Sequence, residues 1–185
     1  MHSPLKILSA SFARDPWMAY IEPDPQRRPR VVDWLSRHSL RLGRQGGLVD
    51  LVDGAGVAIW FPPHSDAFGP GSLIRAGFLS VPFALGPAAA RRLIRSEADL
   101  NTLARPDEAW YFYMLGVHPD AQGQGVARRL IERGLARVDA EGKAARLETN
   151  NPKNVSLYER FGFTVTGHIA TPGMMEQWVM VRPGS

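Results

Sequence analysis

Hydrophobic and polar positions follow two different periods along this chain, and the second half of the chain shows both most clearly. Between residues 124 and 141 the apolar side chains recur every three or four positions, which predicts an amphipathic helix with one buried face. The preceding residues 110–117 form a run of aromatic and branched side chains that is typical of a buried strand. The same two patterns predict a strand over 144–149, a helix over 151–161 and strands over 163–169 and 177–181.

The first half of the chain carries the same signals less regularly. Residues 53–56, Asp-Gly-Ala-Gly, lie between two apolar runs and favour a hairpin turn. Residues 64–86 are rich in Gly and Pro, which predicts a broken helical region. The patterns predict strands over 48–52 and 57–61 and helices over 5–12, 27–44 and 87–103, the first helix ending near Asp15-Pro16. Because strands and helices alternate from residue 110 and end in two strands, we expect an α/β sheet with an antiparallel end.

The length of 185 residues favours one domain spanning 1–185, since domains usually contain roughly 100–200 residues. The formal net charge is +4, and the charged side chains are spread evenly with no basic block. This distribution argues against a nucleic-acid partner and suits a small anionic ligand. No apolar run approaches the roughly 20 residues that cross a bilayer, and the N-terminus lacks a signal-peptide layout. We therefore expect a soluble, cytoplasmic protein with no membrane partner.

Two residue types narrow the chemistry that the chain can perform. The chain contains no Cys, which excludes disulfides, thiolate zinc sites, iron–sulfur clusters and Cys nucleophiles. His38, His64 and His168 show no metal-ligand spacing, and His118 stands before Pro119 as a turn residue would. We therefore expect no metal site.

The most informative segment lies between the aromatic strand and the amphipathic helix, where Gln-Gly-Gln-Gly-Val-Ala occupies positions 122–127. The first N–H groups of a helix have no partner inside the helix, and they lie at the positive end of its dipole. Glycines allow a bulky anion to approach this backbone closely. The segment therefore predicts a cradle for a pyrophosphate group.

Other interpretations of this turn differ in how well they fit. A nucleotide P-loop is excluded because no Gly-Lys-Ser/Thr follows. A dinucleotide fingerprint fits poorly, because Arg128 occupies its third glycine position and five residues, 118–122, separate the strand from Gly123. A turn that only lets the strand and the helix pack together stays open, since the glycines alone do not exclude it.

The segment 122–127 resembles the Gln/Arg-x-x-Gly-x-Gly/Ala signature of the GNAT acyltransferase superfamily. Members of that family hold the pyrophosphate of acetyl-coenzyme A on the amides of this turn and pair the preceding strand with the pantetheine arm. The resemblance therefore implies acetyl-CoA as cosubstrate. It assigns the arm and the phosphates to Leu115, Gly116, Val117, Gln122, Gly123, Gln124, Gly125, Val126, Ala127 and Arg128.

A second segment resembles the same family further along the chain, where Asn154, Tyr158 and Gly162-Phe163 match its pattern. Asn154 and Tyr158 are four residues apart, so they lie on one face of the predicted helix. The resemblance implies that Asn154 binds the cofactor arm and that Tyr158 meets the thioester sulfur. A phenol, with a pKa of about 10, can donate a hydrogen bond or a proton to the departing thiolate. A core aromatic residue is the alternative interpretation of Tyr158.

The base that deprotonates the attacking amine is less specified by the sequence. Glu148 is the first candidate, since it lies on a predicted strand in an apolar stretch where burial raises the pKa of a carboxyl group. A structural carboxylate that binds loop amides is the alternative for Glu148. Tyr113 is the second candidate, with simple strand packing as its alternative, and a water chain is the third.

The family resemblance implies an α/β (α+β) fold with a central, mixed, mostly antiparallel sheet of about six strands flanked by helices. GNAT chains usually begin with a strand, whereas residue 1 lies almost at the first predicted helix here, so we expect that strand to be missing. A missing edge strand leaves backbone for another chain to cover, which favours a homodimer.

The function that the resemblance implies is transfer of an acetyl group from acetyl-CoA to a primary amine of a small-molecule acceptor. The transfer would be direct, because no Cys can hold the acetyl group. Residues 147–166 look most like the puromycin N-acetyltransferase group, but residues 64–105 match it poorly, so its acceptor does not carry over. A non-catalytic acyl-CoA-binding or regulatory module and the acetylation of a protein amine are the alternatives.

Overall fold

The computed structural model describes residues 2–104, 106–170 and 175–184. These residues form a six-stranded sheet in the order β1-β2-β3-β4-β6-β5, in which only the β3–β4 pair is parallel. The strands are β1 (Leu48–Val52), β2 (Gly56–Phe61), β3 (Trp110–Val117), β4 (Ala145–Thr149), β5 (Thr164–Ala170) and β6 (Glu176–Arg182). The predicted mixed, mostly antiparallel sheet of six strands is therefore confirmed.

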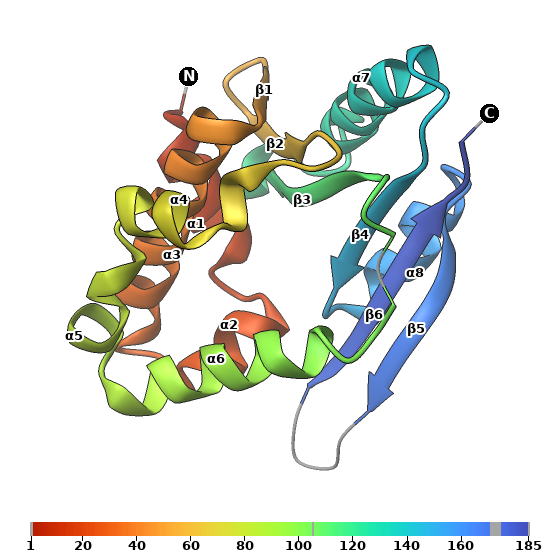
Figure 1. The fold of residues 1–185 in the computed structure, drawn as a ribbon. Coiled ribbons are helices and arrows are strands. Elements are labelled where there is room, and N and C mark those ends of the chain that lie inside the picture. The colour runs from red at the N-terminus through yellow and green to blue at the C-terminus, as the bar shows by residue number, and fades with distance from the viewer. Residues whose placement is uncertain (1, 105, 171–174, 185) are drawn as a thin grey trace.

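Helices cover both faces of this sheet (Figure 1). They are α1 (Pro4–Phe12), α2 (Pro16–Ile21), α3 (Arg28–Gly46), α4 (Pro70–Ala76), α5 (Val81–Leu85), α6 (Pro87–Leu100), α7 (Val126–Ala140) and α8 (Pro152–Glu159), with 3-10 turns η1 (Asp66–Phe68), η2 (Phe78–Ser80) and η3 (Pro119–Ala121). One face packs against α7 and α8, and the other packs against α1, α3 and α4. The helices α2, α3, α5 and α6 share a further apolar cluster. None of the helices in the described ranges is long and apolar enough to cross a membrane.

The predicted elements agree with the observed ones to within a few residues, with one exception. The first predicted helix stops near Asp15-Pro16 and no element is predicted between there and residue 27, but α2 begins at Pro16. The Asp15 carboxylate accepts a hydrogen bond from the Trp17 amide (2.9 Å) and caps α2, and Pro16 occupies the first turn. The pair can stop one helix and start another, because Asp is a good N-cap and Pro a good first-turn residue.

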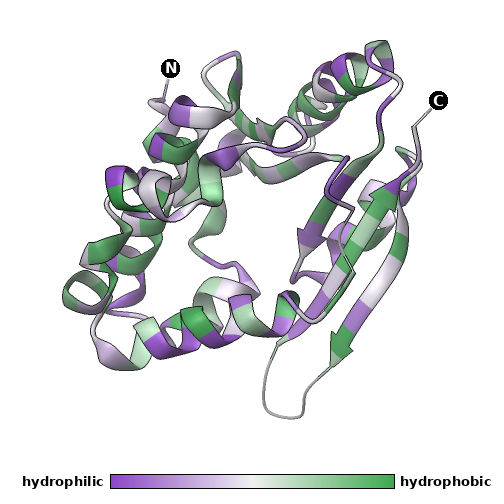
Figure 2. Cartoon of the chain, viewed as in Figure 1, coloured by the Kyte–Doolittle hydropathy of each residue, from purple (hydrophilic) through white to green (hydrophobic). Residues whose placement is uncertain are grey.

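The central strand β2 is buried along its whole length because helices lie on both sides of it. Ala58 and Trp60 belong to the core beneath α7, whereas Val57, Ile59 and Phe61 belong to the core beneath α1 and α3. Because both faces of this strand are buried, its sequence is a continuous run of apolar residues rather than an alternation of apolar and polar ones. In Figure 2, α6 and α7 show hydrophobic and hydrophilic residues along their length, as helices with one buried face should.

A β-bulge interrupts the pairing of β2 with β3. Ile59 lies opposite Met114 and Trp60 lies opposite Phe112, so Tyr113 is an extra residue in β3. The extra residue reverses the alternation of side chains: Phe112 faces the core beneath α7, whereas both Tyr113 and Met114 face the opposite core. Bulges bend a strand and increase its local twist. The bulge therefore turns the second half of β3 away from its starting direction.

The parallel neighbours β3 and β4 separate at the same level as this bulge. Only residues 110–112 of β3 pair with residues 145–147 of β4, and no further pair joins these two strands in the part of the chain that the structure describes. Residues 148 and 149 of β4 still pair with β6. Figure 1 shows β3 and β4 running apart beyond their short contact. The edge of β3 over 113–117 is thus open on the side of β4.

Close packing of α7 on the sheet depends on a residue without a side chain. The rings of Trp60 and Phe112 are stacked, with centroids 4.0 Å apart, and Gly134 of α7 lies directly against the Trp60 ring. A Cβ atom at position 134 would lie 2.2 Å from an atom of this ring, which is far inside van der Waals contact. The indole is fully buried and cannot move aside without opening the core.

We predict that Gly134→Ala destabilises the protein by at least about 2 kcal/mol, although Ala is the better helix former by about 1 kcal/mol. Urea unfolding followed by circular dichroism measures the change. The matched control is Ala136→Gly, at an exposed position of the same helix, which should cost only the helix propensity of about 1 kcal/mol. A stabilising effect of Gly134→Ala would show that α7 does not pack on Trp60 in this way.

Candidate active site

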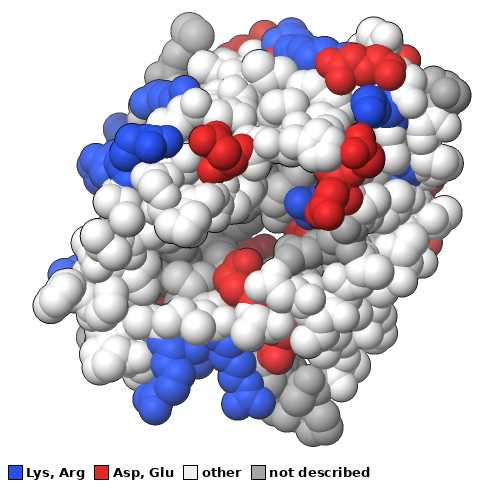
Figure 3. Space-filling model, viewed as in Figure 1, with Lys and Arg blue, Asp and Glu red and all other residues white. Residues whose placement is uncertain are grey.

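A cavity of about 130 Å³ lies where β3 and β4 separate. Its walls come from the junction of α1 and α2, from α6, from the open half of β3, from the end of β4 and from α8. In Figure 3 this side of the molecule is hollowed near its centre, and acidic side chains lie in the hollow. We call this cavity the cleft; it is lined by Phe12, Asp15, Trp17, Glu97, Leu100, Tyr111, Phe112, Tyr113, Met114, Leu115, Glu148, Thr149, Asn150, Asn154 and Tyr158.

The predicted cradle lies at the N-terminus of α7, directly after β3 and η3. Gly123 and Gly125 have φ angles of +75° and +74°, a left-handed conformation that favours glycine. A Cβ atom built on either glycine meets nothing within 4 Å, so the space above both is open. Gly125 is the N-cap of α7 and no side chain caps the helix. The Gln122 side chain donates a hydrogen bond to the Val117 carbonyl (3.3 Å) and ties the loop to the strand end.

Two of the predicted cofactor residues also serve packing. The Val126 side chain is buried in the core beneath α7. Gly116 makes room for α1, because a Cβ atom there would lie 2.6 Å from the Ser11 hydroxyl and 2.7 Å from Leu8. These positions can therefore offer a ligand only their backbone groups, which is also what the family resemblance implies.

The charged residues in the first turn of α7 are engaged at the surface. Arg128 forms an ion pair with Glu132 (2.7 Å), and Arg129 forms one with Asp53 of the β1–β2 turn (2.6 Å). Both pairs are exposed, and exposed pairs contribute little stability, so they can exchange for a phosphate at small cost. The prediction that Arg128 contacts a phosphate stays a prediction.

The structure brings Asn154 and Tyr158 together on the cleft wall, as their spacing on α8 predicts. The Asn154 amide donates a hydrogen bond to the Thr149 hydroxyl at the end of β4 (3.4 Å). The Tyr158 ring contacts Phe112 and Phe163 edge-on, and the residue is only 8% exposed. Burial raises the pKa of the Tyr158 phenol. Its hydroxyl is therefore a proton-bearing donor at neutral pH.

Glu148 lines the cleft as predicted, but the structure adds a partner that the sequence analysis missed. Arg146 donates a hydrogen bond to Glu148 (2.8 Å), and its guanidinium lies 3.9 Å from the centre of the Tyr111 ring. Burial, and next the charge of Glu148, raise the pKa of Tyr111 well above its usual range. The signal for this pair was present in the sequence, because residues two apart on a strand point to the same face.

The structure does not favour Tyr113 as the base. Its hydroxyl lies 3.0 Å from the Ser39 hydroxyl of α3 and forms a hydrogen bond with it. Burial raises the pKa of Tyr113 to about 12. A phenol with this pKa is almost never ionised at neutral pH, so it accepts a proton poorly.

Asp15 is a site residue that the sequence analysis used only as a helix stop. It lines the cleft, and burial raises the pKa of its carboxyl group, while hydrogen bonds from the Trp17 and Met18 amides lower it. Its negative charge adds to the effect of burial in raising the pKa of Tyr158. The sequence contained a signal for this residue, because Asp followed by Pro is typical of a helix N-cap. An Asp at an N-cap places its carboxylate at the start of the helix.

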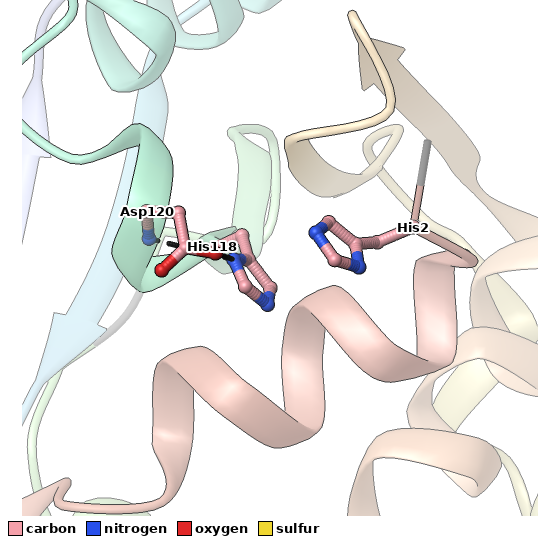
Figure 4. A group of neighbouring side chains, drawn as sticks. All are labelled: His2, His118 and Asp120. Atoms are coloured by element: carbon pink, nitrogen blue, oxygen red, sulfur yellow. Dashed lines mark hydrogen bonds and ion pairs between the residues drawn. The ribbon is translucent and has the colours of Figure 1, made fainter.

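A group of possible metal ligands, His2, His118 and Asp120, lies near the cradle but outside the cleft (Figure 4). The His2 and His118 rings are stacked, with centroids 3.9 Å apart and planes 10° apart. An imidazole binds a metal in the plane of its ring at about 2.1 Å, so two such parallel rings cannot both bind one ion as they stand. His118 also accepts a hydrogen bond from the Asp120 amide (3.4 Å), consistent with the turn role expected for it. The expectation of no metal site stays a prediction.

We predict that the free energy of unfolding falls as the pH rises above about 10. The three buried phenols, Tyr111, Tyr113 and Tyr158, have raised pKa values when folded and ionise near pH 10 when unfolded, so the unfolded chain binds fewer protons there. Each should contribute a slope of up to about −1.4 kcal/mol per pH unit, absent below pH 10. Urea unfolding over a pH series measures the slope. Tyr158→Phe should reduce it, and an unchanged slope would contradict the buried state of this phenol.

Comparison with known proteins agrees with this arrangement. Residues 90–165 match the family model of the Acetyltransferase (GNAT) domain. An N-acetyltransferase of Schizosaccharomyces pombe, itself uncharacterised, is 29% identical over 126 residues, which cover 64% of this chain and 51% of that protein. A mycothiol acetyltransferase of Nocardiopsis dassonvillei is 26% identical over 188 residues, which cover 89% of this chain and 53% of that protein. The chain thus spans about half the length of these curated relatives.

A solved structure shares the fold over nearly the whole chain. The crystal structure of a Corynebacterium glutamicum protein, described as a histone acetyltransferase and related acetyltransferase, superposes with a TM-score of 0.71. The two chains are 22% identical, and the match covers 98% of this chain and 90% of the other. At 22% identity, the likeness to this structure concerns the fold alone. The match to the family model covers residues 90–165, the segment that holds the cradle. Residues 90–165, which include the cradle and the Asn154–Tyr158 pair, therefore match the GNAT acetyltransferase domain, and the chain as a whole shares the fold of an acetyltransferase.

Proposed function

We propose that this protein transfers the acetyl group of acetyl-CoA directly to a primary amine of a small-molecule acceptor. The observation that carries the proposal is the separation of β3 from β4. The separation leaves one edge of β3 open. The glycine cradle lies beyond the end of this strand, and Asn154 and Tyr158 lie on the wall of the cleft. GNAT enzymes use acetyl-CoA as cosubstrate, and these parts match the shape and chemistry of that molecule.

The cofactor would bind along the open edge of β3. Backbone groups of Leu115 and Val117 would pair with the amides of the pantetheine arm, as a neighbouring strand would. The pyrophosphate would rest on the first amides of α7, where the uncapped helix end and the open space above Gly123 and Gly125 favour an anion. Asn154, on the opposite wall, would bind the arm from the other side.

The reaction needs one group that removes a proton and one that stabilises the leaving sulfur. The neutral amine attacks the acetyl carbonyl, a C–N bond forms, and the C–S bond breaks to release coenzyme A as a thiolate. Tyr158 would donate a hydrogen bond to this sulfur. Because the pKa of Tyr158 is raised, the phenol retains its proton when the thiolate forms, and solvent can protonate the released coenzyme.

Glu148 would accept the proton of the attacking ammonium group, directly or through a water molecule. It lies on the cleft wall, and a hydrogen bond from the adjacent Arg146 (2.8 Å) holds its carboxylate in place. Asp15 is a second carboxylate on the wall and could complete such a water chain. No Cys is present to hold the acetyl group, so both substrates would have to be bound together.

The dimensions of the cleft favour a small acceptor over a protein. The cavity measures about 130 Å³ and is bordered by α1, α2 and α6, so the part of the acceptor that enters it would be small. A module that binds acyl-CoA without turnover would need the same cradle. Tyr158 and the carboxylates on the cleft wall favour catalysis over that alternative. A homodimer stays a prediction.

The test of the function is coenzyme A release from acetyl-CoA over a panel of amines, with Tyr158→Phe beside the parent protein. We expect the variant to lower kcat by roughly 10- to 100-fold, the effect of losing one hydrogen bond to a charged group, with little change in KM for acetyl-CoA. The control is Tyr20→Phe, in α2 but outside the cleft, which should retain activity. Acetyl-CoA binding without release for any amine would contradict the proposal and support the module.

The cradle is tested by Gly125→Ala, since the new Cβ would occupy space that the fold leaves open. We expect the Kd for coenzyme A, measured by calorimetry, to rise at least about tenfold, which is about 1.4 kcal/mol. Gly142→Ala is the matched control, because Gly142 also has a positive φ angle (+61°) but lies at the other end of α7. Equal affinities of the two variants would place the pyrophosphate elsewhere.

A further inference from the structure

The walls of the cleft carry charges of one sign. Asp15 comes from the start of α2, Glu97 from α6 and Glu148 from β4, so the three carboxylates enter from three sides. Among the described residues that line the cleft, none is Lys or Arg. Arg146 lies next to it, but its guanidinium is engaged with Glu148 and the Tyr111 ring. Even with Glu148 paired to Arg146, the described walls carry more negative than positive charge, which favours a cationic ligand over an anionic one.

The remaining walls are largely aromatic. The aromatic residues of the lining are Phe12, Trp17, Tyr111, Phe112, Tyr113 and Tyr158. Burial keeps the phenols in their neutral form, so the rings add no charge of their own. Aromatic faces attract ammonium groups and also accommodate apolar bodies. The surface thus suits a molecule that is cationic at one end and apolar at the other.

The position of Glu97 is set by a buried polar network rather than by a freely exposed helix. The hydroxyl of Ser96, the preceding residue, accepts hydrogen bonds from the Trp17 indole (2.8 Å) and from the Gln177 amide (3.3 Å). Ser96 and Gln177 are 0% and 1% exposed. The network joins α2, α6 and β6 beneath the cleft. These hydrogen bonds therefore fix the orientation of α6 about its own axis, and in this orientation Glu97 lines the cleft.

The charge of Glu97 also affects the pKa values of two phenols that line the cleft. Its charge and that of Glu148 both raise the pKa of Tyr111 and Tyr113, which places the two carboxylates near the same pair of phenols. Glu97 is itself exposed, whereas the Glu148 side chain is only 6% exposed. The two therefore differ in position: Glu148 lies deep, where the proposed chemistry occurs, and Glu97 lies at the rim, where an acceptor enters.

We infer that the acceptor is a compact alkyl or arylalkyl amine whose only charges are positive, and that Glu97 is a specificity-determining residue that selects it. This inference rests on the proposed function. An acceptor that carries a carboxylate, such as a free amino acid, would bring a further negative charge into a cleft whose described lining already holds three carboxylates, with Arg146 beside only one of them. A matched amine without that carboxylate meets only attraction. The selection acts on entry and binding, so it should appear mainly in KM.

Three amines of similar shape test the inference: phenethylamine, phenylalaninamide and phenylalanine. The amide and the acid are nearly isosteric and differ in the negative charge and in the basicity of the amine, so kcat/KM is compared for the unprotonated fraction of each amine. We expect the kcat/KM for the amide to exceed that for the acid by at least about tenfold, with the difference decreasing as salt screens the charges. Glu97→Gln should reduce this ratio, Glu97→Lys should reduce it further, and both should raise the KM for phenethylamine more than they lower kcat.

The control variant is Glu159→Gln, which removes an exposed carboxylate of α8 that does not line the cleft and should leave the ratio unchanged. Equal kcat/KM for the amide and the acid, or a ratio that Glu97→Lys does not alter, would overturn the inference while the transfer activity stands.

Calorimetry of the same amines with the coenzyme A-loaded protein distinguishes a failure of the proposed acetyl transfer from a failure of cation selection by the cleft. Amine binding that depends on Glu97, without any coenzyme A release, would contradict the proposed function but support cation selection by the cleft. Binding of phenylalanine as tight as that of phenylalaninamide would overturn the inference in either case.

Discussion

The brevity of the pairing between β3 and β4 is the constraint on which the rest of the site depends. Backbone N–H and C=O groups are strong hydrogen-bonding groups, and a sheet normally satisfies them between neighbouring strands. Here the ladder ends after residue 112, at the level where the bulge at Tyr113 bends β3. A ladder that continued to Val117 would satisfy the same groups internally and leave no cleft. The sheet thus lacks a few hydrogen bonds between β3 and β4. The backbone groups left on β3 can instead pair with a linear ligand that carries amides.

The packing around the cleft explains how a polar site is held inside an apolar core. Gly134 lets α7 lie against Trp60, and Gly116 lets α1 lie against β3, so the two helices pack closely on opposite faces of the sheet. The phenols on the walls are neutral because burial raises their pKa values, which leaves the carboxylates as the charged groups. One of these, Glu148, is compensated by Arg146. The site therefore combines a neutral donor, Tyr158, with charged acceptors in one cavity.

Local patterns in the sequence were sufficient for most of the fold, and they located the two segments that we propose bind the cofactor. Periodicity located the strands and the long helices, because burial on one face dictates the spacing of apolar residues. The glycine turn could be located because its residues are consecutive. Asn154 and Tyr158 were singled out by their match to the family pattern, and their spacing then predicted that they share one face of a helix. The helix α2 was missed because it has only six residues and begins at a pair, Asp15-Pro16, that also ends helices.

The sequence by itself determined which residues form each element and which backbone turn can receive an anion, because these depend on neighbours a few positions away. Only the tertiary structure decided which side chains share the cleft. Asp15, Glu97 and Glu148 are far apart in the chain, and no periodicity relates them. Their meeting follows from the rotation of α6 and from the short β3–β4 ladder, and both result from contacts between distant segments. Long-range packing sets such angles, and no local pattern of residues encodes them.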